Sequence, residues 1–191
     1  MTTLKDQQFQ LRESIIVDAM YHLLVQNSYA ATTMDDVAAH VGISKATLYL
    51  HFKSKTELAL RVIVQHMEEA EANIKSLDSS LPAFERLKRT LYTSINGRAT
   101  MGAAHIDLLP EEVYGDPAFQ AAKRKLARTT NDLIEEAQRQ GEIRPDLSSR
   151  LIQEFISTIF DMNFERLTKD GLSVELLSEQ IIDMLMRAIR P

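Results

Sequence analysis

The 191-residue sequence contains no cysteine and no tryptophan, and it has only six glycines and five prolines. Without cysteine the chain has no disulfide framework, no thiolate nucleophile and no cysteine-ligated zinc site, which fits a reducing cytoplasm. No apolar run approaches the ~20 residues that cross a bilayer, and the first ten residues lack the basic-then-apolar order of a signal peptide. We therefore expect a cytoplasmic protein without a membrane segment.

Helix-forming residues dominate the composition. Leu, Ala, Glu, Lys, Arg and Met are abundant and helix breakers are rare, which predicts an all-α fold. The net charge of −5 is unevenly divided, because residues 1–55 hold five basic and five acidic side chains and the rest hold 17 and 22. A neutral first part can present a locally positive face, so the net charge does not exclude nucleic acid as a partner.

Apolar spacing and turn residues divide the chain into helical segments. The longer predicted helices cover residues 7–26, 54–76, about 84–95, 117–140, 146–169 and 173–190. We expect two domains of unequal size, residues 1–60 and residues 61–191, with the boundary inside the long helix that begins at Ser54.

Three helix-start signals crowd into residues 32–58. Thr33 with Asp36 begins one short helix, and Gly42 ends it where a left-handed residue is needed. Ser44 caps a second short helix, and Ser54-x-x-Glu57 is a capping box for the long helix. Two short helices joined by a tight glycine turn form a helix-turn-helix over about residues 33–52, whose second helix is presented to the DNA major groove.

The second short helix sorts its side chains into two groups. Ile43 and Leu48 supply an apolar plug beneath the helix, and the residues expected to face outward are Lys45, Thr47, Tyr49 and His51. These outward residues are donors and amphipathic rings without a carboxylate, as polyanionic DNA requires. The alternative is that Tyr49 and His51 are packing residues, which would leave the helix almost no exposed face.

The stretch TTMDDVAAHVGISKATLYLHFKSKTEL resembles the signature of the TetR/AcrR family of bacterial transcriptional regulators nearly position by position. The resemblance covers about the first third of the chain. It implies a three-helix N-terminal DNA-binding domain, a larger C-terminal helical domain with an inducer pocket, about nine helices in all, and a homodimer. Such a dimer binds a palindromic double-stranded DNA operator.

The resemblance also implies roles for individual residues. Thr33 and Lys55 would hold phosphates at the starts of two helices. Base edges would be faced by Lys45, Ala46 and Thr47, and the backbone or bases by Tyr49 and His51. Ser44 completes the set of predicted DNA-binding residues. Leu50 departs from the aromatic or polar residue often found at its position, so it receives no contact.

The last two predicted helices carry wide apolar stripes, which suggest a four-helix interface made by two chains. The predicted dimer-interface residues are Ile152, Ile156, Ile159, Asn163, Leu177, Ile181 and Leu185. Asn163 lies near the middle of its stripe, where it either bonds to a neighbouring helix of its own chain or fixes the register of the dimer.

Methionines and aromatic side chains in the later helices either line a ligand pocket or form plain core. The candidate pocket residues are Tyr92, Met101, His105, Phe119, Phe155 and Met162. An apolar pocket with His105 as a polar anchor would select a hydrophobic small molecule rather than a sugar or a phosphorylated metabolite.

No catalytic, cofactor or metal site is predicted. The chain has no HExxH motif, no glycine-rich phosphate loop and no recognisable Ser/His/Asp set, and its spaced His and acidic pairs bring no third ligand. The leading hypothesis is a dimeric, ligand-responsive repressor. A DNA-binding regulator controlled by a protein partner is the alternative, and a helical enzyme is a remote one.

Overall fold

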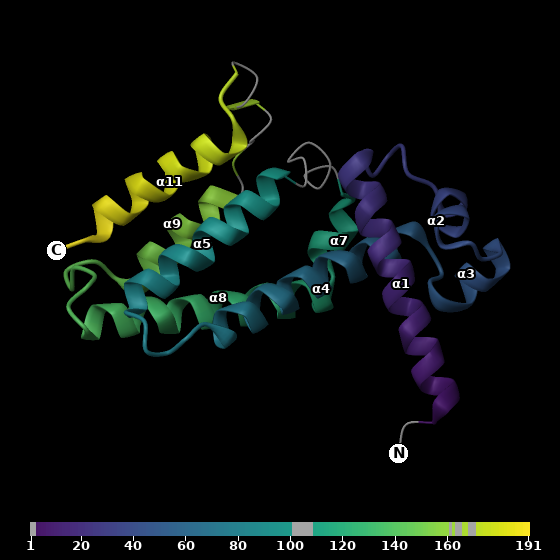
Figure 1. The fold of residues 1–191 in the computed structure, drawn as a ribbon, viewed down its shortest axis with the longest axis horizontal. Helices are drawn as coiled ribbons and strands as arrows, with labels where there is room; N and C mark the ends of the chain where they lie inside the picture. Colours follow the sequence, from purple (N-terminus) through teal and green to yellow (C-terminus); the bar gives the residue numbers. More distant parts are fainter. Residues whose placement is uncertain (1–2, 101–108, 161, 163–165, 168–170) are drawn as a thin grey trace. The chain divides into compact units, whose positions relative to one another are not determined.

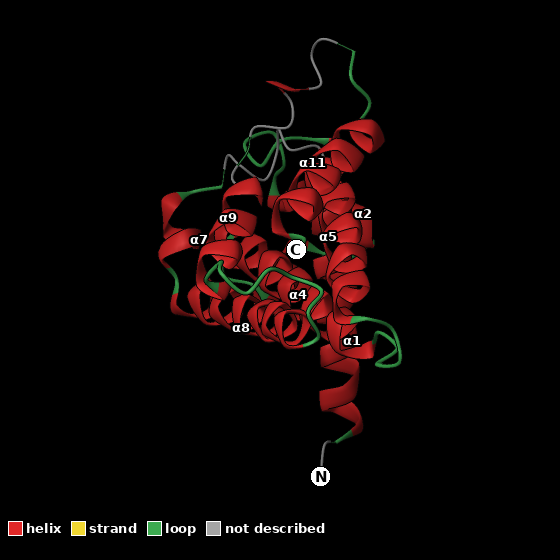
Figure 2. Ribbon diagram, turned by 90° about the vertical axis from the view of Figure 1, so that its left-hand side faces the viewer, coloured by secondary structure: helices red, strands yellow, loops and turns green. Residues whose placement is uncertain are grey.

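The computed structural model describes residues 3–100, 109–160, 162, 166–167 and 171–191, of which residues 98–100 are described by their backbone alone. Within these residues the chain forms helices and loops but no strand, which confirms the all-α prediction (Figures 1 and 2). The helices are α1 (Leu4–Gln26), α2 (Met34–Val41), α3 (Lys45–His51), α4 (Lys55–Ser76), α5 (Ala83–Thr100), α7 (Glu111–Gly115), α8 (Pro117–Arg139), α9 (Ser149–Phe160) and α11 (Val174–Ile189). None of the described helices is both long enough and apolar enough to span a membrane.

The described residues group into two compact units. The first unit comprises the chain up to His66 together with residues 109–120, and the second comprises the other residues from Met67 onward. Helix α4 begins in the first unit and ends in the second. The predicted assignment of DNA binding to residues 1–60, and of ligand binding and dimerisation to residues 61–191, stays a prediction.

Local capping bonds determine where the short helices of the first unit begin and end. Thr33 Oγ1 accepts the N–H of Asp36 at 3.1 Å, and Asp36 Oδ2 accepts the N–H of Thr33 at 2.8 Å, so the predicted capping box opens α2. Gly42 ends α2 in the left-handed region with φ 74°. A residue with a Cβ adopts this conformation only at a cost, and the glycine therefore permits the tight turn into α3.

The next two helices also begin at predicted serines. Ser44 Oγ accepts the N–H of Thr47 at 3.1 Å, and Ser54 Oγ accepts the N–H of Glu57 at 3.0 Å. The carboxylate of Glu57 differs from the predicted box, because it accepts the N–H of Lys53, one residue before the cap. All three helix starts between residues 32 and 58 are thus present.

Helix α1 starts earlier than its apolar spacing predicts. Thr3 and Asp6 form a capping box that begins the helix at Leu4 instead of residue 7. The core of the first unit includes fully buried side chains of α1 to α4, among them Ile16, Met20, Leu24, Val37, Leu48 and Leu58. Helix α1 packs against α2, and α2 against α3.

A cluster of isoleucines and leucines from α4, α5, α8, α9 and α11 forms the core of the second unit. Helix α11 packs against α5 (Figure 1). The loop after α8 is bonded to the start of α5, because Gln140 and Glu142 accept the N–H groups of Ala83 and Phe84 at 3.1 and 2.9 Å. Its Arg144 N–H donates to the carbonyl of Ile189 at the end of α11, at 2.9 Å. Helix α9 covers Ser149–Phe160 of the predicted helix 146–169, and in the rest of that range the structure describes a bend at Met162 and helical backbone at residues 166–167.

A buried carboxylate joins α4 to α8 within the second unit. The Glu71 side chain is 6% exposed and lies 2.7 Å from Lys125 and 2.5 Å from Lys75. The hydrogen bonds from Lys125 and then Lys75 lower the pKa of Glu71 to about 2. Glu71 is therefore ionised at neutral pH. Its ion pair with Lys125 holds α4, the helix that follows α3, to α8.

Candidate nucleic-acid interface

Helix α3 buries one side in the first unit and exposes the other. Successive residues are 100° apart, which places Lys45, Tyr49, Ala46 and Leu50 within one arc of about 140°. All four are exposed, and Leu50 is 70% exposed. Leu48, on the opposite side, is completely buried. The predicted plug is therefore confirmed for Leu48, while Ile43 is only half-buried. The outward surface is a single face formed by the four exposed residues.

The prediction that His51 faces outward is wrong. Its side chain is 3% exposed, with Nδ1 3.7 Å from Glu13 Oε1, and its ring stacks on Phe9 of α1 at a centroid distance of 4.0 Å. The prediction took alternate residues of the helix, and residues two apart lie on nearly opposite sides of it. Thr47 is half-buried for the same reason.

Lys45 meets a carboxylate that the sequence analysis did not place at this surface. Its Nζ lies 2.8 Å from Asp35 Oδ1, and both side chains are more than half exposed. The hydrogen bond from Lys45 to Asp35, and then the charge of Asp35, raise the pKa of the lysine. Asp35 stabilises the first turn of α2, and it would compete with any acceptor group of DNA for Lys45.

Replacing Asp35 with asparagine should tighten DNA binding by up to about fivefold, because it frees Lys45 from an exposed ion pair of that strength. The matched control is Asp18→Asn, which removes an exposed carboxylate from the same unit and changes the net charge equally. Fluorescence anisotropy titrations at two salt concentrations measure the effect. Equal tightening in the control, or none in Asp35→Asn, would contradict the expectation.

Lys55 is held by the loop between α1 and α2. Its Nζ donates to the carbonyl oxygens of Tyr29 and Thr32, both at 2.9 Å, and lies 4.1 Å from the centre of the Tyr29 ring. This cation therefore anchors the loop that precedes Thr33, whose own hydroxyl donates to Asp36 at 2.6 Å. The predicted phosphate contacts of Thr33 and Lys55 stay predictions.

The predicted ligand residues are divided between the two units and the residues that the structure does not describe. Met101 and His105 lie outside these residues. Phe119 is buried in the first unit, edge-to-face with Tyr114, while Tyr92 and Phe155 are exposed residues of the second. Met162 packs against the core of the second unit. Their role in ligand binding stays a prediction.

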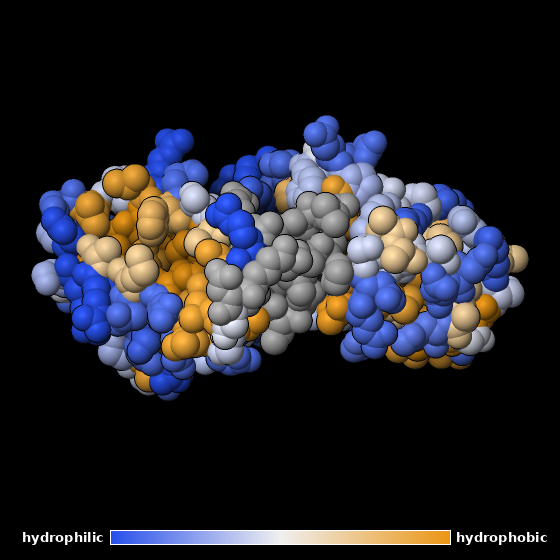
Figure 3. All heavy atoms as spheres, turned by 90° about the horizontal axis from the view of Figure 1, so that it is seen from above, coloured by the Kyte–Doolittle hydropathy of each residue, from blue (hydrophilic) through white to orange (hydrophobic). Residues whose placement is uncertain are grey.

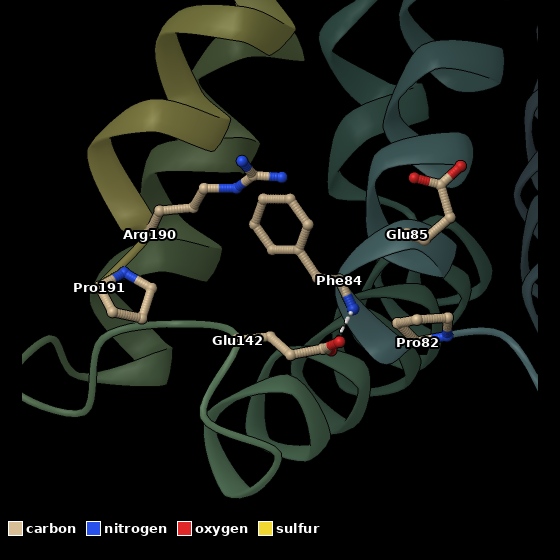
Figure 4. Close-up of a pocket in the computed structure, with 6 residues that line it drawn as sticks. All are labelled: Pro82, Phe84, Glu85, Glu142, Arg190 and Pro191. Atoms are coloured by element: carbon tan, nitrogen blue, oxygen red, sulfur yellow. Dashed lines mark hydrogen bonds between the residues drawn. The ribbon is translucent and has the colours of Figure 1, made fainter.

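Two surface clefts of the second unit have charged linings. A cleft of about 740 Å³ between α5 and α11 is lined by Phe84, Lys88, Tyr92, Glu179, Ile182, Asp183, Met186, Arg187 and Arg190. The smaller cleft beside it, of about 370 Å³, is shown in Figure 4, where the Arg190 guanidinium lies by the Phe84 ring, 4.7 Å from its centre. These linings differ from the apolar pocket that the sequence predicts.

Most predicted dimer residues are covered by their own chain. Ile152, Ile156, Ile159, Leu177 and Leu185 are each at most 6% exposed, and Ile181 packs partly buried against the same core. The expectation that a partner covers these five side chains is wrong, because α5 and α8 contribute to the core around them. Asn163 lies outside the described residues.

Other apolar side chains of α9 and α11 remain at the surface. Leu151, Phe155, Leu176 and Met184 are between 44% and 71% exposed. Figure 3 shows apolar side chains gathering on the face of the second unit that this view presents. Each of the two helices thus leaves apolar side chains exposed outside the core.

Comparison with known proteins identifies relatives of this sequence. Residues 16–62 match the family described as bacterial regulatory proteins, tetR family. The HTH-type transcriptional regulator YhgD of Bacillus subtilis is 29% identical over 160 residues, which cover 78% of this chain and 83% of the relative.

Solved structures share the fold across nearly the whole chain. The transcriptional regulator FadR of Bacillus subtilis, in complex with stearoyl-CoA, has a TM-score of 0.69 at 21% identity, covering 93% of this chain and 99% of that one. A TetR-family regulator from Agrobacterium tumefaciens has a TM-score of 0.73 at 22% identity, covering 96% and 100%. A regulator from Saccharomonospora viridis, in complex with choline, has a TM-score of 0.76 at 19% identity, covering 95% and 99%. Residues 16–62, which hold the helix-turn-helix and the exposed face of α3, thus match the tetR family of bacterial regulatory proteins, and the whole chain has the fold of TetR-family transcriptional regulators.

Proposed function

We propose that this regulator is a dimeric repressor that binds a palindromic operator through α3 and leaves it when a hydrophobic small molecule binds. The observation that carries the proposal is the exposed face of α3, where Lys45, Ala46, Tyr49 and Leu50 stand outward above the buried Leu48. A short helix held from below and open on its outer side has the form that enters a major groove.

The DNA contacts that we propose are of two kinds, contacts with base edges and contacts with phosphates. Lys45, Ala46 and Tyr49 lie on the outward face and approach base edges, and Thr47 lies half-buried at its edge. Thr33, Ser44 and Lys55, at the starts of helices, approach phosphates. His51 positions α3 against α1 through its stack on Phe9 and leaves the set of contacting side chains.

We propose that two copies associate through the apolar face that α9 and α11 leave exposed. Leu151 and Phe155 on α9 and Met184 on α11 replace the buried isoleucines of the sequence-based interface. A two-fold dimer would set two recognition helices against half-sites one helical turn apart, ~34 to 36 Å.

The proposed effector acts through linkage. A molecule that binds the dimer better when its recognition helices are wrongly spaced lowers operator affinity by the ratio of its two affinities. Helix α4 is the proposed connection, since it starts after α3 and Glu71 holds its other end to α8. The relatives bound to stearoyl-CoA and choline support a ligand, and the stearoyl chain of the first supports an effector with a long apolar part.

The experiment that tests DNA recognition begins with duplexes selected from a random library by the wild-type protein. Tyr49→Ala should weaken binding to the selected duplex by roughly 1 to 3 kcal/mol, as expected for a residue at base edges. Tyr92→Ala is the matched control, because Tyr92 is 41% exposed and Tyr49 37%. Unchanged binding by a correctly folded Tyr49→Ala protein would contradict the proposed contact of Tyr49 with base edges.

The effector needs its own test. A thermal-shift screen of fatty acyl, aromatic and sugar compounds identifies binders by their increase in Tm. The compounds that raise Tm are then titrated against the preformed protein–DNA complex. Release by apolar compounds supports the proposal, and release by sugar phosphates alone contradicts it. A complete lack of binders would favour control by a protein partner.

A further inference from the structure

We propose that Leu50, assisted by Ala46, reads thymine through its C5-methyl group in the major groove, and this proposal rests on the proposed function. The family resemblance gave Leu50 no contact, because an aromatic or polar residue is often found there. The structure gives it a position on the outward face of α3, with 70% of the residue exposed.

The outward face of α3 has a polar edge and an apolar edge. Lys45 and Tyr49 are four residues apart and therefore form one row along the helix. Ala46 and Leu50 form a second row, about 100° around the helix from the first. A helix in the major groove would therefore meet the bases with donors along one edge and with methyl and isobutyl groups along the other.

Leu50 is separate from the packing of the first unit. Leu48 and Phe52, two residues to either side, are at most 5% exposed, and His51 is held against Phe9. Helix α3 is thus fixed without Leu50. A single exposed leucine is ordinary on a protein surface, so its exposure alone decides nothing. Its place on the face that meets DNA in the proposed function distinguishes it.

The chemistry of the groove limits what an isobutyl group can recognise. Leucine has no donor or acceptor in its side chain, so it cannot bind a phosphate or the polar edge of a base. Thymine is the base that presents a methyl group in the major groove, and apolar side chains contact that group. Ala46, one turn earlier, is short enough to allow a close approach of the helix. Each operator half-site should therefore carry a thymine opposite Leu50.

The test uses the duplex that wild-type protein selects from a random library. Each thymine is replaced in turn by deoxyuridine, which keeps the Watson–Crick edge and lacks the methyl group. Wild-type affinity should fall about fourfold at one position of each half-site, the value of one buried methyl-sized group. Leu50→Ala should bind the parent duplex more weakly, and it should lose no further affinity at that position.

Leu11→Ala is the matched control, because Leu11 is a 65%-exposed leucine of the same unit. It should keep the uracil sensitivity of the wild type. Equal melting temperatures for the three proteins show that the fold is intact.

Failure of the proposed function and failure of this inference alone give distinguishable results. If the wild type enriches no sequence, the proposed function fails and this inference fails with it. If the wild type binds a selected duplex specifically, the inference alone is overturned when no thymine is sensitive, or when Leu50→Ala retains the wild-type sensitivity.

Discussion

Replacing Ile156 with glutamate should unfold the second unit, whereas the same replacement at Phe155 should leave it folded but monomeric. Ile156 is 3% exposed within the core cluster, and its neighbour Phe155 is 56% exposed on α9. A carboxylate at position 156 has no partner in an apolar core, so we expect a loss of roughly 3 to 5 kcal/mol. A carboxylate at position 155 stays in water in one chain and becomes buried only between two.

Light scattering and circular dichroism together separate the two outcomes. The wild type should scatter as twice 21.7 kDa, and Phe155→Glu as 21.7 kDa with an unchanged helical signal. Ile156→Glu should lose helical signal and aggregate. Each variant controls for the other, because the added charge is the same and the positions are adjacent. A fully dimeric Phe155→Glu protein would contradict the proposed interface.

Leu48→Ala should destabilise the first unit by about 2 to 5 kcal/mol, the range for removing a buried leucine side chain. Leu48 is completely buried beneath α3, and no other residue of that helix is fully buried. Loss of this plug should also abolish specific DNA binding, because α3 no longer holds its outward face in place.

Leu50→Ala supplies the comparison for Leu48→Ala. The two changes are chemically identical and two residues apart, but Leu50 is 70% exposed, so its replacement should alter stability by no more than about 0.5 kcal/mol. Urea denaturation measures the stability of both variants. Hydrogen exchange of the α2 and α3 amides then shows whether the change in stability lies in the helix-turn-helix. Similar stabilities for the two variants would show that Leu48 does not plug the space beneath α3.

Local signals in the sequence were sufficient for the helix-turn-helix. Thr33, Ser44 and Ser54 each cap a helix through atoms three residues away, so short windows of sequence contain the whole interaction. Gly42 has the left-handed backbone that its position in the turn requires. Caps and turns formed by residues about three positions apart can be predicted without knowing which helices pack against each other.

Contacts between distant residues were not predictable in the same way. The burial of His51 depends on Phe9, which belongs to a helix that starts one turn earlier than expected because of Thr3. Apolar stripes on α9 and α11 were interpreted as a dimer interface. Periodicity shows that a face is buried, but it does not distinguish a partner chain from the core of the same chain.

The caps of α5 have a consequence for the order in which the chain folds. The first N–H groups of α5 bond to Gln140 and Glu142, which are 57 and 58 residues away along the chain. The caps of α2 and α3 span three residues. Short-range contacts form sooner than long-range ones, and synthesis proceeds from the N-terminus. During translation the helix-turn-helix can therefore form before the loop after α8, which caps α5, has been synthesised. A nascent chain thus acquires α3 before the core of its second unit exists.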